Sequence, residues 1–368
     1  MNSNVIIVAI VAVVIVGAGA GVYIALNNGN SNSGEKEIEP RDVTIKDSLG
    51  NDITITAPIT KVCTVNTNAA EFFQMLGVNE RIVGMDTSGK AALGKTYENV
   101  TDIGDYKTPN GEKIAQTGAK YVISQSSSRS MSTETEQALK DNYGIIVLRM
   151  DFFGETMMTD VEELLKILIS DSASTAFEEY KTTYNSVIST VKNVTKDVSG
   201  NPSFLFLMAS MSSTAGTYYS TSSELSKIVT DLHGHNAQTD MNVTSKTSTF
   251  KPAASKVLDI SSEGHDNLGY VFIRGTDGQT AAQSYQVFLN TGGDLEFADN
   301  LKVVEHRHVY VINTDVLSGP RDYIGRVCIA NAYGIDVGLN SLELVNQFNQ
   351  KYGFEISYSY IMTQFPAA

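Results

Sequence analysis

The hydrophobic pattern begins with an uninterrupted apolar run from Val5 to Leu26, which contains no charged residue. At helical rise this run would cover about 33 Å, and the hydrocarbon core of a bilayer is about 30 Å thick. The residues before it carry no basic side chain, although a cleavable signal peptide usually has one. We therefore predict an uncleaved transmembrane anchor over residues 1–26, with cleavage in the small-residue tract Gly17–Gly21 as the alternative.

A polar segment follows the apolar run. Asn27–Gly34 consists mostly of Asn, Ser and Gly, and acidic residues follow at Glu35, Glu37 and Glu39. This composition is typical of a flexible linker, which we place at residues 27–41. Because the chain starts weakly positive and leaves the apolar run through acidic residues, we expect the long C-terminal part to be exported. The predicted location is the cell membrane, with the folded part on the extracytoplasmic side.

Beyond the linker, apolar and polar residues alternate and then fall into short runs. Val43–Ile45 and Ile53–Ile55 flank the turn signal Asp47–Asp52, which predicts a β-hairpin. Strands and helices then alternate, which predicts a mainly parallel sheet covered by helices in an N-terminal lobe, residues 42–153. The predicted strands are Val62–Val65, Ile82–Met85, Tyr121–Ser124 and Ile145–Leu148, and the predicted helices are Ala69–Leu76, Glu112–Thr117 and Thr133–Tyr143.

A long helical pattern divides the chain. Thr159 and Glu162 form a capping-box signature at the start of an apolar stripe with helical spacing. The stripe breaks at Ser170–Ser172, resumes, and is stopped by Ser199–Pro202. We therefore expect backbone helices over residues 154–198 that join two α/β halves.

The second half, residues 199–368, repeats the alternation of strands and helices. Parallel sheets present ligand-binding loops at the carboxyl ends of their strands, so two such lobes on a stiff helical connection should enclose a binding cleft. The predicted strands are Phe204–Met208, Tyr270–Ile273 and Val309–Ile312, and the predicted helices are Ser222–Leu232, Ala281–Asn290, Asp322–Tyr333 and Leu342–Tyr352.

Size and charge limit the classes of function. The roughly 325 residues after the linker exceed what one hydrophobic core usually supports, which again indicates two lobes. A formal net charge of -14 argues against nucleic acid as a partner. Cys63 and Cys328 are too few for a disulfide scaffold. N-glycosylation patterns begin at Asn99, Asn193 and Asn242, and they are compatible with an extracytoplasmic location.

One motif indicates a different activity. Gly89–Thr96 matches the phosphate-binding pattern GxxxxGK[ST]. That loop binds phosphate because a helix N-terminus follows it, whereas Tyr97–Asp105 lacks helical periodicity. We interpret the match as a lysine-bearing surface loop and keep a surface-anchored nucleotide hydrolase as an alternative. Without a G-x-S-x-G, H-E-x-x-H or C-x-x-C motif in the sequence, we do not expect an enzyme.

All five histidines lie in the second half of the chain, and four of them form two H-x-H pairs. Alternate residues of a strand share a face and imidazole suits zinc, so such pairs could hold a metal. A metal held between lobes would usually draw ligands from both, and the first half has no histidine. We therefore expect surface histidines and no site for a bare metal ion. The residues concerned are His233, His235, His265, His306 and His308.

Several segments, in this order and spacing, resemble the helical-backbone class of substrate-binding proteins of ABC importers, over nearly all of residues 42–354. The sequence departs from that class at His233-Gly234-His235, where paired glycines are common, and at Asn267-Leu268-Gly269, where Pro-Asp is common. The segments that carry the resemblance are Asp47–Asn51 with Ile53–Ile55, Lys61–Gly77 with Arg81–Gly84, Asp102–Gly104 with Pro109–Ile114, Gly216–Tyr219 with Leu232–Asn236, and His308–Ile312 with Leu317–Arg321.

The resemblance implies two α/β lobes on a backbone helix and an extracytoplasmic receptor for a ferric siderophore, cobalamin or haem. It implies a permease as partner and, through it, a cytoplasmic ATPase, with no intrinsic cofactor. In that class an acidic residue on each lobe contacts permease arginines, and the matching positions here are Glu112 and Glu224. A bare metal ion or an oxyanion is the alternative ligand, and an adhesive surface domain without a small ligand is a further alternative.

The expected ligand contacts are residues in loops that follow strands. Arginine offers a planar fork of donors for carboxylate or phosphate, and aromatic rings offer a flat surface for a large chelate or macrocycle. We therefore predict a bulky anionic ligand. The expected contacts are Thr67, Asn68, Ser126, Ser127, Arg129, Asp151, Phe152, Tyr218, Tyr219, Arg274 and Arg321.

Overall fold

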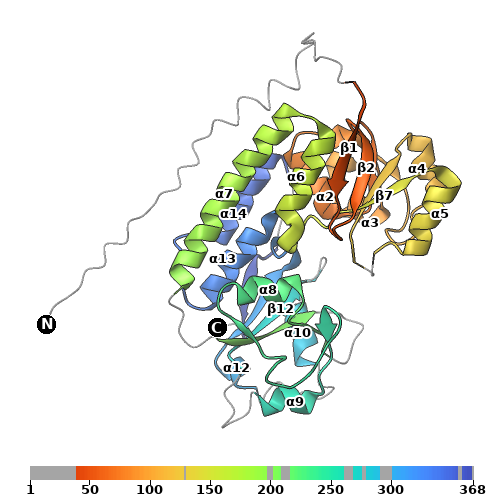
Figure 1. Cartoon of the computed structure of the whole chain (residues 1–368). Coiled ribbons are helices and arrows are strands. Elements are labelled where there is room, and N and C mark those ends of the chain that lie inside the picture. Colours follow the sequence, from red (N-terminus) through yellow and green to blue (C-terminus); the bar gives the residue numbers. More distant parts are fainter. Residues whose placement is uncertain are drawn as a thin grey trace.

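The computed structural model describes residues 39–127, 130–196, 202–208, 216–260, 268–275, 279–290, 301–354 and 359–366. Two α/β lobes are joined by a pair of helices, as predicted (Figure 1). The predicted anchor and most of the linker lie outside the described residues. Among the residues that are described, none of the helices has the length and apolar character needed to span a bilayer.

The N-terminal lobe follows an antiparallel entrance hairpin, which confirms the first predicted element. Its five strands are all parallel, in the order β5-β4-β3-β6-β7. Asn or Ser side chains cap α2, α4 and α5 at their first turns, which explains where these helices begin. The elements are β1 (Arg41–Lys46), β2 (Asp52–Ala57), β3 (Val62–Thr64), α2 (Thr67–Met75), β4 (Ile82–Met85), α3 (Thr87–Leu93), β5 (Thr101–Asp102), α4 (Gly111–Thr117), β6 (Tyr121–Ser124), α5 (Thr133–Tyr143) and β7 (Ile146–Arg149).

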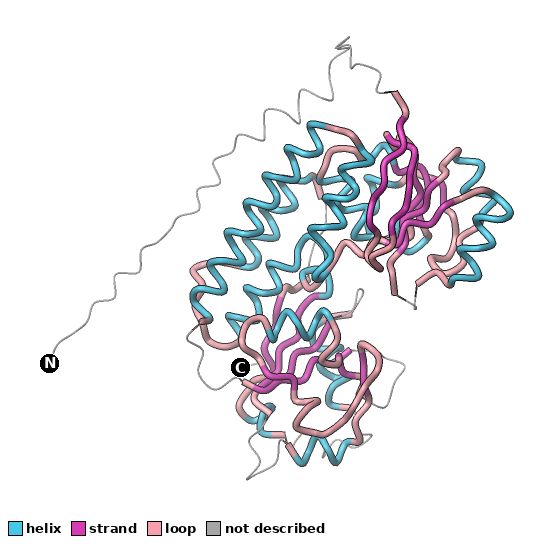
Figure 2. Tube along the Cα trace, in the orientation of Figure 1, coloured by secondary structure: helices cyan, strands magenta, loops and turns pink. Residues whose placement is uncertain are grey.

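Two helices, α6 (Met157–Leu168) and α7 (Asp171–Thr195), connect the lobes. The predicted capping box is wrong, because α6 begins at Met157 and Thr159 lies inside its first turn. The break between the helices is confirmed, and the Ser170 side chain caps α7. In Figures 1 and 2 the long helix α7 runs beside α13 and α14 of the second lobe.

The C-terminal lobe contains a mixed sheet. Its central strands β8, β12 and β13 are parallel, as predicted, whereas β9, β11 and β14 add antiparallel edges that the sequence pattern did not indicate. The elements are β8 (Ser203–Met208), β9 (Tyr218–Tyr219), α8 (Glu224–Thr230), β10 (His235–Asn236), β11 (Thr249–Phe250), α9 (Ala254–Asp259), β12 (Tyr270–Gly275), α10 (Ala281–Leu289), α12 (Lys302–Glu305), β13 (Val309–Asn313), α13 (Asp322–Ala332), α14 (Ser341–Tyr352) and β14 (Met362–Phe365).

One apolar core extends through both lobes. It includes Phe72 of α2, Phe177 of α7 and Ile324 of α13, each of which is buried. Polar contacts reinforce this junction, because the Gln74 side chain donates to the Tyr352 and Gly353 carbonyls at 3.0 Å. The lobes are therefore packed against each other on the side of α2.

Candidate functional site

The carboxyl ends of the N-lobe strands are tied together by a buried asparagine. Asn66 follows β3, and its Oδ1 accepts the Asn68 N–H at 3.0 Å, which caps α2. Its Nδ2 donates to the Met150 and Asp151 carbonyls after β7, at 2.8 and 3.0 Å. This arrangement leaves Thr67 and Asn68 half-buried at the first turn of α2.

Two predicted contact residues meet at this edge. The Asp151 carboxylate accepts the Ser126 N–H at 2.7 Å and the Ser126 hydroxyl at 2.6 Å. Ser127 follows on the same loop and is exposed. Arg129 lies outside the described residues. The N-lobe side of the site is therefore lined by hydroxyl, amide and carboxylate groups.

Phe152 does not face a ligand. Its side chain is buried, and its ring centroid lies 5.8 Å from that of Phe72 in the core. Its backbone is left-handed, with φ of 54°, and its N–H donates to the Asp160 carboxylate at 2.9 Å. Burial raises the pKa of Asp160. Phe152 therefore stabilises the turn after β7, in which the chain reverses direction to enter α6.

Arg274 is the cation at the carboxyl end of the central C-lobe strand β12. Its Nε donates to Thr314 Oγ1 at 2.5 Å and its Nη1 to the Tyr219 hydroxyl at 3.1 Å. Both partners are neutral, and no carboxylate among the described residues pairs with Arg274. The guanidinium is half-buried and held in place, without a carboxylate partner among the described residues.

The two predicted tyrosines contribute differently. Tyr218 is 2% exposed and packs its ring against Phe250 in the second hydrophobic cluster. Tyr219 packs edge to face on Phe206 and directs its hydroxyl to Arg274. Adjacent strand residues point to opposite faces, so only Tyr219 can reach the site.

Arg321 lies at the junction of the lobes and not at a ligand surface. It follows β13 in the turn η5 (Gly319–Arg321), and its guanidinium pairs with the Glu71 carboxylate of α2. The two side chains are 5% and 4% exposed. Burial raises the pKa of Glu71 to about 7, although Arg321 opposes the shift. The predicted cluster of three arginines is therefore reduced to Arg274 within the described residues.

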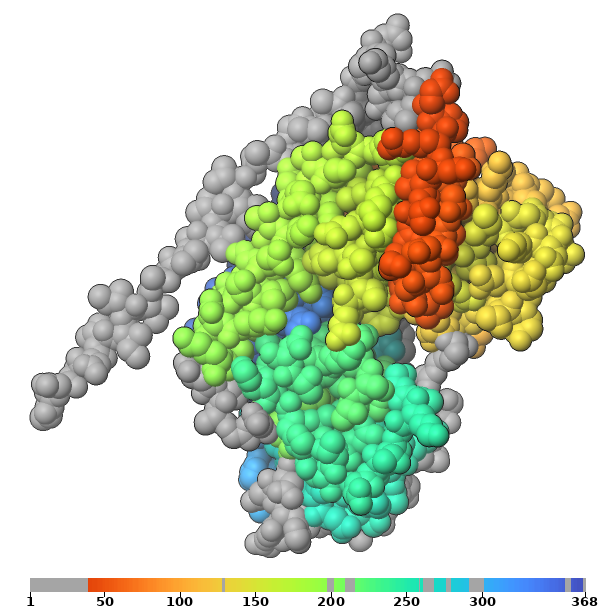
Figure 3. All heavy atoms as spheres, viewed as in Figure 1, coloured from red at the N-terminus to blue at the C-terminus, as the bar shows by residue number. Residues whose placement is uncertain are grey.

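The space-filling view shows a hollow between the lobes (Figure 3). A pocket of about 600 Å³ lies on the N-lobe rim. It is lined by the entrance hairpin, the loop after β6 and the start of α5, and it includes Ser126, Ser127 and Leu49. Leu49 is 59% exposed, so this rim is apolar as well as polar.

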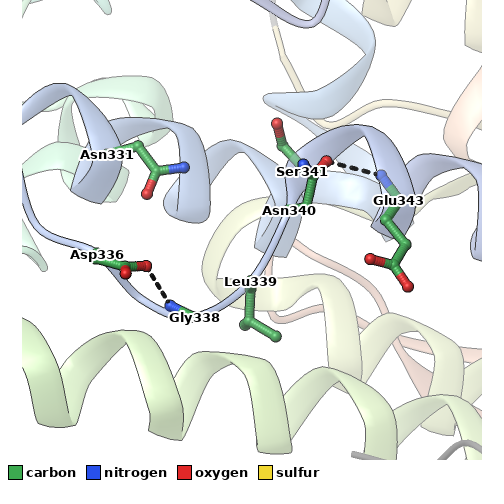
Figure 4. Close-up of a pocket in the computed structure, with 7 residues that line it drawn as sticks. All are labelled: Asn331, Asp336, Gly338, Leu339, Asn340, Ser341 and Glu343. Atoms are coloured by element: carbon green, nitrogen blue, oxygen red, sulfur yellow. Dashed lines mark hydrogen bonds between the residues drawn. The ribbon is translucent and has the colours of Figure 1, made fainter.

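A second pocket, of about 400 Å³, lies between α13 and α14 (Figure 4). The side-chain acceptors in this pocket bond to N–H groups of the same segment. Asp336 accepts the Gly338 N–H, and Asn340 accepts the N–H groups of Leu342 and Glu343. These contacts shape a helix start, and the pocket is built from a loop outside the strand ends described above.

The two predicted docking acids differ in environment. Glu112 is exposed in the first turn of α4 and accepts from the Gln116 side chain at 3.3 Å. Glu224 is 27% exposed and accepts from Lys227 at 2.8 Å and from the Glu155 N–H at 3.3 Å. By chain order the counterpart of α4 is α9, since each precedes a central strand, and α9 carries Ser255 at the position that Glu112 has in α4.

The described histidines do not form a metal site. No group of three or more potential ligands occurs in the part of the chain that the structure describes, and His265 lies outside it. His308 stacks on Tyr270 with ring centroids 4.8 Å apart, and His235 pairs with Asp240 at 3.0 Å. Cys63 and Cys328 are buried and unpaired.

The phosphate-loop match lies in a helix, which corrects the expected surface loop. Gly89 is inside α3, and the rest of the motif continues into the 3₁₀ turn η2 (Gly94–Tyr97). A Cβ at Gly89 would lie 2.8 Å from the capping carboxylate of Asp86, so glycine is required here by packing. With its first glycine in a helix, the motif cannot wrap around a phosphate.

Two site residues were missed from sequence. Asn66 and Thr314 organise the loops after β3 and β13, and both are buried. Asn66 had a usable signal, since an Asn between a predicted strand and helix is a typical cap. Thr314 had none, because its role depends on the neighbouring strand.

The asparagines of the three glycosylation patterns, Asn99, Asn193 and Asn242, are all exposed.

No family model matches the chain, and no curated protein matches it in sequence. Solved structures nevertheless match its fold. The TroA-like periplasmic binding protein FepB from Veillonella parvula aligns with a TM-score of 0.65 at 17% identity, over 88% of this chain and 99% of that one.

Two further matches are similar in extent. Helicobacter pylori CeuE with Ni(II) bound gives a TM-score of 0.62 at 17% identity, over 86% of this chain and 97% of that one. A periplasmic heme-binding protein from Pseudomonas aeruginosa gives 0.58 at 12% identity, over 75% and 93%. The chain therefore has the fold of these two-lobed binding proteins, as the sequence resemblance predicted.

Proposed function

We propose that this chain is the extracytoplasmic receptor of an ABC importer, which captures an iron siderophore or another bulky metal chelate or tetrapyrrole. The observation that carries this proposal is the match of fold over 88% of this chain and 99% of FepB. The matched structures include proteins described as heme-binding and as Ni(II)-bound, which supports this ligand class. Delivery requires a permease and, through it, a cytoplasmic ATPase.

The cleft chemistry supports an anionic ligand. Arg274 presents a guanidinium that pairs with no carboxylate in the described part of the chain, and Tyr219 and Thr314 fix its orientation. A charge-assisted, two-pronged contact with a carboxylate or phenolate oxygen would compensate it. We retain Thr67, Asn68, Ser126, Ser127, Asp151, Tyr219 and Arg274 as proposed ligand contacts, and Arg129 as a candidate outside the described residues.

Thermal shift of the full chain in detergent tests the ligand class, since a ligand that binds only the folded state raises its melting temperature. We expect a rise with ferric siderophores, haem or corrinoids. Arg274→Gln should weaken binding about 10- to 100-fold, which corresponds to the loss of one charge-assisted contact. Arg41→Gln, an equal charge change on the exposed start of β1, should leave binding unchanged.

Two results would favour the alternatives. A rise with divalent metals or molybdate alone would indicate a bare-ion or oxyanion receptor. ATP hydrolysis by the purified chain would support the nucleotide hydrolase that the Gly89–Thr96 pattern suggests.

Docking through Glu112 is part of the proposal, because its carboxylate is exposed at a helix start and could pair with permease arginines. Replacing it with Ala should abolish transport in cells while ligand affinity stays unchanged. Gln116→Ala, one turn along the same helix, is the control. Loss of ligand affinity in the Glu112 variant would contradict the docking role.

The proposed topology places residues 1–26 in the membrane and the folded lobes outside, with residues 27–41 as a tether that raises the local concentration of receptor near its permease. In a host that glycosylates exported proteins, Asn99, Asn193 and Asn242 would be accessible acceptors. Protease protection of intact cells and intact-protein mass would test both points.

A further inference from the structure

The lobes meet a second time, away from the buried junction of α2. The turn η3 (Gly154–Thr156) begins soon after the last N-lobe strand, and α8 begins soon after β9 of the C-lobe. These two segments contact each other (Figures 1 and 3). Asp151 lies three residues before Gly154, and Tyr219 lies five residues before Glu224, so the contact adjoins both sides of the proposed cleft.

One lysine joins carboxylates from opposite sides of this contact. Lys227 Nζ lies 3.0 Å from Glu155 Oε2 and 2.8 Å from Glu224 Oε1. The hydrogen bond to Glu224 is the main reason that the pKa of Lys227 is raised, and Glu155 adds to the effect. Glu224 and Lys227 are on the same helix, so Glu155 is the partner that is lost if the lobes separate.

The backbone of η3 is shaped to receive Glu224. Gly154 has a φ of +63°, and a Cβ there would clash with Glu224 Oε2. The next residue, Glu155, donates its N–H to the same oxygen at 3.3 Å. The Glu224 carboxylate therefore packs against the Cα of Gly154, which carries no side chain. We call Gly154, Glu155, Glu224 and Lys227 the interlobe cluster.

The cluster is accessible to water, with side-chain exposures of 34% for Lys227, 27% for Glu224 and 76% for Glu155. Exposed ion pairs are weak and are screened by salt. Such a contact can bias the distance between the lobes without fixing it, unlike the buried junction on the other side.

We propose that Lys227 is a positioning residue that holds the two lobes together at the edge of the cleft, and that breaking its bond to Glu155 lets the cleft open. This inference concerns the motion of the lobes and does not depend on the ligand. It adds a consequence to the proposed function, because Glu224 is also a candidate docking residue. A permease arginine that took the Glu224 carboxylate would compete with the Glu155 N–H, which is one of the contacts that close the lobes.

The distance between the lobes can be measured directly by electron–electron double resonance on the full chain. Spin labels at Ala138→Cys on α5 and Ser255→Cys on α9 would report it, since both positions are exposed. Cys63 and Cys328 are buried and should not react. We expect Lys227→Gln and Glu155→Gln each to raise the population of longer distances about two- to fivefold, the range that an exposed ion pair can supply.

A closely matched control is present in the same chain. Lys181 also joins a carboxylate one turn earlier, Glu178, to one on another helix, Glu162, and its exposure of 32% is similar. Both partners lie on the connecting helices, so Lys181→Gln should leave the distances unchanged. Lys227→Arg should restore them, and 1 M NaCl should shift the wild type as Lys227→Gln does.

A Lys227→Gln distribution identical to that of the wild type, in a variant with unchanged circular dichroism, would overturn the inference. An equal shift in Lys181→Gln would also overturn it. Neither outcome involves a ligand or a permease, so the result is separable from the test of the proposed function.

Discussion

The two contacts between the lobes differ in their exposure to water. The Glu71–Arg321 pair is buried, and Arg321 also lies over the rings of Phe348 and Phe354 at 5.7 and 5.9 Å. The interlobe cluster has the same kinds of charge but is partly solvated. Removing one partner of a buried pair leaves a charge without compensation, whereas solvent replaces a lost exposed partner. The buried contact therefore governs folding, and the exposed one can govern motion.

The largest effect should follow from breaking the buried pair. Arg321→Met removes the cation from the buried pair, so Glu71 must either keep an uncompensated charge or bind a proton, and the free energy of unfolding should fall by about 3–5 kcal/mol. Urea denaturation would measure it. Combining this change with Glu71→Gln should recover most of the loss. A single variant as stable as the wild type would remove the distinction between the two contacts.

The pH dependence of stability provides a second test of the buried junction. Burial raises the pKa of Glu71 to about 7 and that of Asp322 to about 6, from ordinary values of 4.5 and 3.8. Their protonated forms favour the folded state, so this contribution is complete below about pH 4 and is lost as pH rises through 6 to 7.

Ionisation of the other carboxylates should raise the melting temperature as pH rises over this range. Glu71 and Asp322 should make that rise smaller. Glu71→Gln should make stability increase more with pH between 5 and 7, as scanning calorimetry would show. An unchanged pH profile in this variant would contradict the raised pKa.

A smaller effect should distinguish the packing of the interlobe cluster from backbone strain. Gly154→Ala places a Cβ against Glu224, whereas Gly144→Ala has a similar φ of +67° and nothing within 4 Å of its Cβ. Each should lose about 1 kcal/mol from the left-handed backbone. Gly154→Ala should lose more and should lengthen the interlobe distance. Equal losses would indicate that Glu224 moves aside freely.

The smallest change in stability should come from Lys227→Gln, which should alter the free energy of unfolding by less than about 1 kcal/mol. The variant should also lose the salt dependence of the interlobe distance. A large destabilisation in urea would mean that the interlobe cluster contributes to stability as much as the buried Glu71–Arg321 pair does. The two contacts would then not differ in the way described above.

The sequence predicted the elements that follow local rules. Tyr121–Ser124 and Thr133–Tyr143 were predicted with their observed bounds, because a short buried run and a Ser cap with a terminal Gly are local signals. The antiparallel strands β9, β11 and β14 were missed, since they are short and are defined by their partners.

The candidate site was less predictable for the same reason. Arg274 and Arg321 both follow strands and are equivalent in sequence, yet one faces neutral partners and the other a buried acid 250 positions away. Phe152 and Tyr218 were expected at a surface because they adjoin strand ends. Their side-chain directions depend on a turn and on strand alternation that periodicity alone does not determine.

The apolar core that passes from Phe72 through Phe177 to Ile324 has a consequence for modularity. A lobe cut out at its chain boundary would expose the part of that core that the other lobe covers, so neither lobe is expected to fold alone. Exchange of one lobe between relatives would succeed only if the complementary surface of α2, α7 and α13 were exchanged with it. Proteins with this two-lobed fold should therefore diversify by changing loops at the strand ends while the two halves are inherited together.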